Sequence, residues 1–214
     1  DESFLRYINT PKIIVTSNLR LQASYDPTGK YVFANGVGIV LGDPTLYHYV
    51  TAVLNSSIAS AFPEIWSRQG VRNTSGLNAQ MLKRFPITFP KKEITENIIS
   101  TISRYLIYLN RQKQIAKKYS IPGYQELIDF YKRISDLLIL DAYFTSDLDP
   151  KLLDVLAENI TASDEEFEYS DDINLLIGLQ EIKKNILNSP DFVKCRFSNE
   201  FTNILATLKN TRVW

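Results

Sequence analysis

The sequence predicts an α+β protein: a small mixed β-sheet module with a helix, residues 1–90, is followed by a mainly α-helical region, residues 91–214. Two patterns support this order. Polar and apolar residues alternate over residues 19–25, between turn signals, as in a half-buried strand. From residue 94 onwards, apolar residues recur every three or four positions, as in amphipathic helices. With 44% apolar and 12% aromatic residues, a chain of this length can bury a core.

The β-rich start of the chain is predicted to form an antiparallel meander, in which each strand pairs with the next one along the chain. Asp26-Pro27-Thr28-Gly29 carries a proline at the second position of a β-turn. Asn35-Gly36 supplies the positive φ angles that a two-residue hairpin requires. The four expected strands cover residues 12–16, 19–25, 31–34 and 37–41.

One helix is expected within the β-rich part, over residues 46–60, with its apolar side chains on one side. A loop follows it. Residues 85–89, which contain one proline and precede another, are then predicted to form a closing edge strand. The helices expected in the second part are residues 94–118, a helix begun by Pro122 that continues through Leu138, a third capped by Asp149-Pro150, and residues 170–187 and 198–209.

Charge is divided unequally along a chain whose formal net charge is zero. Residues 1–118 carry 15 Lys and Arg against 7 Asp and Glu, whereas residues 119–214 carry 9 against 17. A surplus of cations in the first part predicts a polyanionic partner, because each phosphate neutralised by Lys or Arg releases counterions. The alternative is that the two parts attract each other. Residues 161–172 hold six acids and are interpreted as a flexible acidic connector.

Three short motifs follow one another in a characteristic order within residues 46–87. They are Leu54-Asn55-Ser56-Ser57, then Trp66-Ser67-Arg68-Gln69-Gly70-Val71-Arg72-Asn73, then Met81-Leu82-Lys83-Arg84-Phe85-Pro86-Ile87. This order resembles the target recognition domain of prokaryotic restriction and modification enzymes. The resemblance is to the TaqI-like C-terminal specificity domain of adenine-specific DNA methyltransferases and fused type IIG restriction enzymes, and it covers roughly residues 11–145.

The resemblance implies that the first part of the chain binds double-stranded DNA and recognises its sequence. The residues predicted to contact DNA are Arg20, Gln22, Lys30, Arg68, Arg72, Asn73, Lys83 and Arg84. Arginine can span the two acceptors of guanine in the major groove, and asparagine can pair with the donor and acceptor of adenine. Lys83 is expected to hold a phosphate. The alternative for the loop is a solvated basic segment without a ligand.

The resemblance also implies that methyl transfer takes place elsewhere. In this family the donor is S-adenosylmethionine, and an Asn-Pro-Pro-aromatic motif faces the target amine. The chain has no Pro-Pro pair, so we expect the methyltransferase domain of the parent enzyme to lie N-terminal to Asp1. The absence of an initiator Met agrees with a piece of a longer protein. We expect no cofactor-binding residue within the 214 residues.

Four aromatic residues of the first part could stack on an extruded base, as base-modifying enzymes require. Core packing is the preferred interpretation, because half-buried sheet faces are built from such residues. The four are Tyr25, Tyr31, Phe33 and Trp66.

Catalytic and metal-binding patterns are weak. Glu181-Ile182-Lys183 imitates half of a metal-dependent nuclease motif, but it falls within a helical pattern and no suitable strand acid precedes it, which favours a solvated helix face. His48 and Cys195 have no nucleophile or second metal ligand at a recognised spacing. We therefore expect no catalytic residue and no metal site.

Two alternative functions remain open at this level. The apolar spacing from Ile94 to Leu140 is compatible with a helical protein-interaction module, and a specificity subunit of a type I restriction-modification system is a close variant of the first hypothesis. A single cysteine excludes an internal disulfide, and no apolar run approaches the roughly 20 residues that cross a bilayer. The expected location is the cytoplasm, without a membrane partner.

Overall fold

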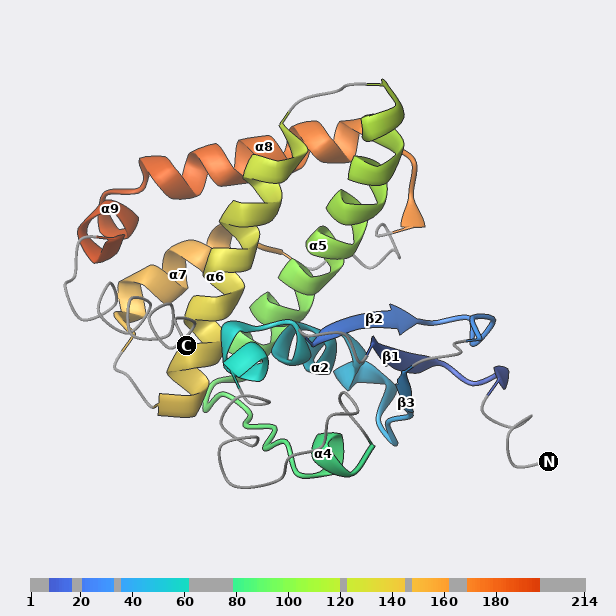
Figure 1. The fold of residues 1–214 in the computed structure, drawn as a ribbon. Coiled ribbons are helices and arrows are strands. Elements are labelled where there is room, and N and C mark those ends of the chain that lie inside the picture. Colours follow the sequence, from blue (N-terminus) through green and yellow to red (C-terminus); the bar gives the residue numbers. More distant parts are fainter. Residues whose placement is uncertain are drawn as a thin grey trace. The chain divides into compact units, whose positions relative to one another are not determined.

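The computed structural model of the protein divides into two compact units, Asp1–Ile87 (unit 1) and Thr88–Trp214 (unit 2), close to the predicted boundary at residue 90. A small antiparallel sheet with a helix and a mainly helical second part confirm the predicted α+β class (Figure 1). The residues that the structure describes are 8–16, 21–32, 36–61, 79–119, 123–144, 148–161 and 169–196.

The sheet of unit 1 has three described strands, β1 (Lys12–Thr16), β2 (Gln22–Asp26) and β3 (Val37–Ile39), in the order β2-β1-β3. Both outer strands run antiparallel to β1, and β3 pairs with it over the register Ile13↔Ile39 to Val15↔Val37. The predicted meander is therefore wrong, because the third strand returns beside the first rather than beside its predecessor in sequence.

The strand predicted over residues 31–34 is also wrong for its described part. Tyr31 and Val32 have no strand structure, whereas residues 33–35, with the expected hairpin turn, lie outside the described residues. The physical reason is local. The Tyr31 backbone N–H donates to Oδ2 of Asp26 at 2.9 Å, so it does not pair with a neighbouring strand.

Alternation along β2 is confirmed where it is described. Leu21 and Ala23 are buried, whereas Gln22 and Ser24 are exposed. Leu19 and Arg20 lie outside the described residues. The polar side of this strand is therefore available to solvent, as the alternation predicts.

The expected helix over residues 46–60 is interrupted. A 3-10 turn (Pro44–Leu46) leads into α2 (Tyr47–Leu54), and residues 57–61 form a further helical turn after a break at Asn55 and Ser56. All eight residues of α2 are buried, so burial extends around the whole helix and is not limited to the side on which its apolar residues were expected. The helix packs on β2 and β1, and such all-round burial is typical of an internal helix.

The predicted closing strand over residues 85–89 is absent. A short helix, α4 (Ala79–Lys83), is followed by an extended segment without strand pairing. The backbone N–H of Phe85 donates to the carbonyl of Leu82 at 3.1 Å, as at a helix end. Pro86 has no N–H to donate, which further disfavours a ladder.

Unit 2 consists of five described helices: α5 (Glu93–Tyr119), α6 (Tyr124–Phe144), α7 (Pro150–Asn159), α8 (Ile173–Asn188) and α9 (Pro190–Arg196). The predicted helices over 94–118, after Pro122, after Asp149-Pro150 and over 170–187 are confirmed within a few residues. The side chain of Asp149 accepts a hydrogen bond from Lys151 N–H and caps α7 as expected. The sequence did not predict α9, and residues 198–209 lie outside the described residues.

The long helices α5 and α6 pack side by side, and α8 crosses α6 (Figure 1). Three tyrosine hydroxyls of this pair donate to backbone carbonyls of later segments: Tyr105 to Thr161, Tyr108 to Asp172 and Tyr131 to Leu179. Desolvation raises the pKa of Tyr105 to about 12. The phenols are therefore neutral donors that fasten the later segments onto α5 and α6.

Among the described helices, none combines the length and apolar character that a bilayer span demands.

Candidate nucleic-acid interface

The structure describes four of the eight residues predicted to contact DNA. Gln22, Lys30, Lys83 and Arg84 are all exposed. They fall in three places: Gln22 begins β2, Lys30 follows the opposite end of that strand, and Lys83 and Arg84 lie at the end of α4. The other four, Arg20, Arg68, Arg72 and Asn73, lie outside the described residues, as does the loop that was predicted to recognise bases.

A buried ion pair lies at the end of the sheet that carries Lys30. Lys12 begins β1 and Asp26 ends β2, and the two residues face each other in the antiparallel register. Nζ of Lys12 lies 3.1 Å from Oδ2 of Asp26, and the side chains are only 3% and 2% exposed. The same ammonium donates to the carbonyl of Gly29 at 2.8 Å and to that of Ile8 at 3.4 Å. Its hydrogen-bonding capacity is thus used within the protein.

The Asp26 carboxylate also organises the turn after β2. Its Oδ1 accepts from the N–H and the hydroxyl of Thr28, at 3.1 and 2.9 Å, and its Oδ2 accepts from the N–H of Tyr31. Burial raises the pKa of this carboxyl. The hydrogen bonds from Tyr31, Lys12 and Thr28 outweigh that effect, so the pKa lies below its ordinary value of 3.8. Asp26 is therefore a charged acceptor. Its hydrogen bonds stabilise the turn formed by residues 26–31, called the Asp26 turn below.

Gly29 is the residue of this turn that no other amino acid can replace without rearrangement. Its φ is +68°, a conformation that side-chain-bearing residues rarely adopt. A Cβ atom at this position would lie 2.5 Å from the backbone carbonyl carbon of Asn9 and 2.6 Å from the backbone nitrogen of Thr10. The Asp26 turn is thus held against the chain that precedes β1 as well as by the ion pair.

The Asp26 turn leads to a pair of exposed side chains that were expected to be buried. Tyr31 is 68% exposed and Val32 is 64% exposed, so the prediction that Tyr31 packs in the core is wrong. Tyr25 behaves as predicted: its ring stacks on that of Tyr47 with centroids 4.7 Å apart. Phe33 and Trp66 lie outside the described residues. The difference arises because Tyr31 leaves the sheet to bond Asp26, whereas Tyr25 stays within β2.

Asn55 has a structural role that the sequence did not reveal. Its Oδ1 accepts from the backbone N–H of Ala23 at 3.0 Å, and its Nδ2 donates to the carbonyl of the same residue at 2.8 Å. The carboxamide therefore pairs with β2 as a neighbouring strand would. Ser56 then caps the following turn, because its hydroxyl donates to Val53 and accepts from Ala59 N–H. Asn55 thus supplies hydrogen bonds to one residue on the outer edge of β2.

We expect Asn55→Asp to destabilise unit 1 by about 1 to 3 kcal/mol, because one carboxylate oxygen would then face the Ala23 carbonyl and leave it without a donor. Hydrogen exchange at the β2 amides measures the change. Gln22→Glu, which adds the same charge at an exposed neighbouring position, is the matched control and should exchange like the wild type. Equal exchange rates in the two variants would show that the carboxamide pairing contributes nothing.

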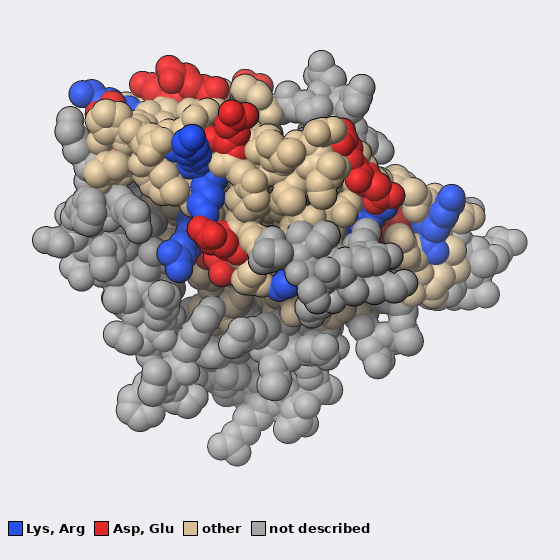
Figure 2. Space-filling view, turned by 90° about the horizontal axis from the view of Figure 1, so that it is seen from above, with Lys and Arg blue, Asp and Glu red and all other residues tan. Residues whose placement is uncertain are grey.

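The described part of unit 1 exposes more positive than negative charge. Lys12 and Asp26 neutralise each other, so the exposed charges in these ranges are Lys30, Lys83 and Arg84 against Asp43. Asp43 is engaged locally, since its carboxylate accepts from the hydroxyl and N–H of Thr45 at 2.7 and 2.9 Å, and these bonds lower its pKa. On the face of the molecule shown in Figure 2, by contrast, acidic and basic side chains are interspersed.

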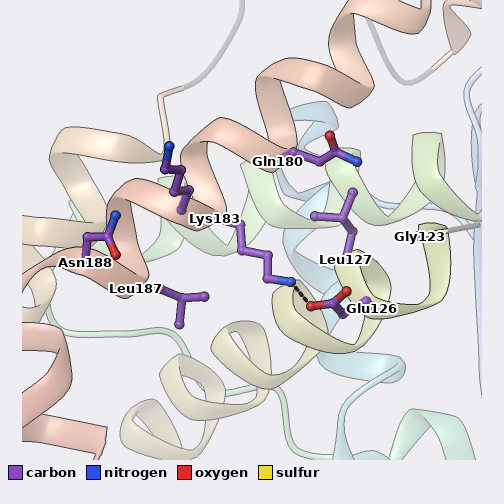
Figure 3. A pocket seen from close by; sticks show the side chains of 8 residues that line it. Gly123, Glu126, Leu127, Gln180, Lys183, Leu187 and Asn188 are labelled. Atoms are coloured by element: carbon purple, nitrogen blue, oxygen red, sulfur yellow. Dashed lines mark hydrogen bonds and ion pairs between the residues drawn. The ribbon is translucent and has the colours of Figure 1, made fainter.

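Unit 2 contains a shallow hollow of about 330 Å³ between the start of α6 and the later half of α8. Figure 3 shows Lys183 from α8 reaching across to Glu126 from α6, with which it forms an ion pair. Glu181 is exposed on the same helix. The Glu181-Ile182-Lys183 triplet thus lies on a helix, as predicted, and its lysine is used in a contact between helices.

In the ranges that the structure describes, no three His, Cys, Asp or Glu residues are grouped to hold a metal ion.

The apolar stripe on which the protein-interaction alternative depends is mostly buried. Ile98, Ile102 and Leu109 of α5 are at most 1% exposed, as is Tyr131 of α6, whereas Ile94 is 44% exposed. Since α5 and α6 pack against each other, packing within the chain accounts for at least part of this periodicity.

Comparison of the chain with protein-family models, curated proteins and solved structures found no match.

Proposed function

We propose that unit 1 recognises a specific sequence in double-stranded DNA, as the specificity domain of an adenine-specific DNA methyltransferase or a type IIG restriction-modification enzyme. The observation that carries the proposal is an exposed lysine on a turn that a buried ion pair holds in place. Lys30 is exposed within the Asp26 turn, whose backbone is held by hydrogen bonds from Lys12 and to Asp26. When Lys30 binds a phosphate, the backbone of the turn loses little conformational freedom, because it is already ordered.

Within this proposal the cations have two roles. Lys30 and Lys83 bind phosphates and set the register of the protein on the duplex. Arg68, Arg72 and Asn73, with Arg84, then contact base edges, and each good bidentate pair supplies about 1 to 3 kcal/mol of discrimination. Gln22, at the start of β2, and Arg20 add further contacts with the duplex. The excess of exposed cations in unit 1 and the charge division of the sequence support this assignment.

The proposal places methyl transfer, and S-adenosylmethionine with it, in a separate methyltransferase domain of a cytoplasmic parent enzyme. A type I specificity subunit is the nearest variant. In both cases the 214 residues contribute recognition rather than bond making.

The test is the salt dependence of binding to duplex DNA, measured by fluorescence anisotropy. Lys83→Ala should weaken binding to all sequences alike and reduce the slope of log K against log salt by about 0.9, the value for one phosphate. Arg72→Ala should instead relax the preference at one base pair of a site selected from random duplexes. Lys132→Ala, at an exposed position of α6, is the control and should bind like the wild type.

Two results would contradict the proposal. A wild-type chain that does not bind mixed duplex DNA even at low salt has no such function, and the protein-interaction alternative then takes its place. A preference that survives Arg72→Ala unchanged would remove the assigned loop from base recognition.

A further inference from the structure

Two consecutive large apolar side chains, Tyr31 and Val32, are the most exposed of their kind in the described part of unit 1. Tyr31 and Val32 are 68% and 64% exposed, whereas the next most exposed large apolar side chain in the described part of unit 1, Val40, is 40% exposed. Single exposed apolar residues are common on protein surfaces. Two consecutive exposed apolar residues directly after an exposed lysine form a candidate contact surface for a partner.

The backbone that leads into this pair is held by hydrogen bonds as far as Tyr31. The N–H of Tyr31 is bonded to Asp26, whose second oxygen holds Thr28, and Lys12 ties the carbonyl of Gly29 to the same cluster. A ligand that contacts Tyr31 therefore has little backbone to immobilise, and more of the contact energy is available for binding.

The charges around the turn favour an anionic partner. Lys30 is exposed next to Tyr31, whereas the acid of the turn, Asp26, is 2% exposed and neutralised by Lys12. An exposed cation next to an aromatic and an aliphatic side chain matches a nucleic-acid strand, which offers phosphate next to the faces of bases and sugars.

We propose that Tyr31 and Val32 form an apolar wedge that packs into a base step of the duplex while Lys30 holds the adjacent phosphate. This inference rests on the DNA-binding function proposed above and assigns to it a contact that is not electrostatic. Tyr31 supplies a ring that stacks on a partly unstacked base, Val32 fills the space beside it, and the Asp26 turn keeps both in position. The energy of the contact compensates for the unstacking of the step.

The experiment uses the full chain and a duplex site selected from random sequences, with 2-aminopurine placed at each adenine of that site in turn. We expect Tyr31→Ala to weaken binding about tenfold or more without changing the salt slope, since base–aromatic stacking carries no counterion release. Lys30→Ala should lower the slope by about 0.9. Tyr31→Phe should bind within about twofold of the wild type, because it keeps the ring. The wild type, but not Tyr31→Ala, should raise 2-aminopurine fluorescence at one step.

Ile177→Ala is the matched control for loss of an exposed apolar side chain, since Ile177 is 56% exposed on α8. It should leave DNA binding unchanged. If the wild type binds DNA and Tyr31→Ala binds equally well, or if no 2-aminopurine position responds, the wedge is wrong and the proposed function stands. If Tyr31→Phe loses as much affinity as Tyr31→Ala, the hydroxyl rather than ring packing makes the contact, and the wedge is also wrong. If the wild type does not bind DNA at all, both proposals fail.

Discussion

Lys12→Met is expected to lower the free energy of unfolding of unit 1 by about 3 to 5 kcal/mol, the usual cost of removing one partner of a buried ion pair. Methionine keeps much of the length of the lysine side chain and removes its charge. The Asp26 carboxylate would then stay buried without its counter-ion, and the carbonyl of Gly29 would lose its 2.8 Å donor. Since domains are stable by about 5 to 15 kcal/mol, a loss of this size brings the unit close to unfolding.

Native-state hydrogen exchange at the β1 amides measures this loss without assuming that the two units unfold together. Exchange limited by global opening should accelerate by more than about a hundredfold, since each 1.4 kcal/mol corresponds to a factor of ten. Lys30→Met makes the same chemical change at an exposed lysine and should shift stability by no more than about 0.5 kcal/mol. A Lys12→Met protein that exchanges no faster than Lys30→Met would show that the pair does not stabilise the sheet.

The contribution of Asp26 should also depend on pH. Its pKa in the folded protein lies below the ordinary 3.8, so the unfolded chain takes up the proton first as pH falls. The stabilisation is therefore fully present above the unfolded pKa and is lost as pH falls through the folded one. The difference between wild type and Lys12→Met should accordingly shrink when exchange is measured below about pH 4.

Leu138→Ala is expected to destabilise unit 2 by about 2 to 5 kcal/mol. Leu138 is fully buried on α6, and truncation removes apolar contacts and leaves a cavity. Hydrogen exchange at the central amides of α5 and α6 reports the loss. Lys132→Ala, on an exposed position of the same helix, is the control and should change stability by no more than about 0.5 kcal/mol. A cost below 1 kcal/mol for Leu138→Ala would mean that the α5–α6 core can collapse around the missing side chain.

The helices of unit 2 were predictable because their signals are local. Apolar spacing marked α5 and α6, with Pro122 as a start signal for the second, and Asp149-Pro150 marked the start of α7, since a cap and a helix-compatible φ act within one turn. The missed helix, α9, has seven residues and too few apolar positions to show a period. A long helix can be predicted because its apolar spacing repeats several times in the sequence. The formation of a short helix depends on tertiary contacts that the local sequence does not reveal.

The sheet and the candidate interface were less predictable because their contacts join distant residues. Nothing near Val37 indicates that its partner is Val15 rather than the preceding segment. The Asp26 turn was recognised as a turn, but its ion pair with Lys12 spans 14 residues, and so the exposure of Tyr31 could not be foreseen. Alternation did identify the exposed Gln22, which needs only the two-residue period of a strand.

The pairing of Asn55 with Ala23 has a consequence for how sequences of this kind can diverge. The carboxamide bonds only to main-chain atoms at position 23, so what residue 23 supplies to this contact is common to every amino acid except proline. At position 55, in contrast, a short side chain must bring one donor and one acceptor to the N–H and the C=O of one residue, a combination that asparagine offers. We expect related sequences to vary more readily at residue 23 than at residue 55.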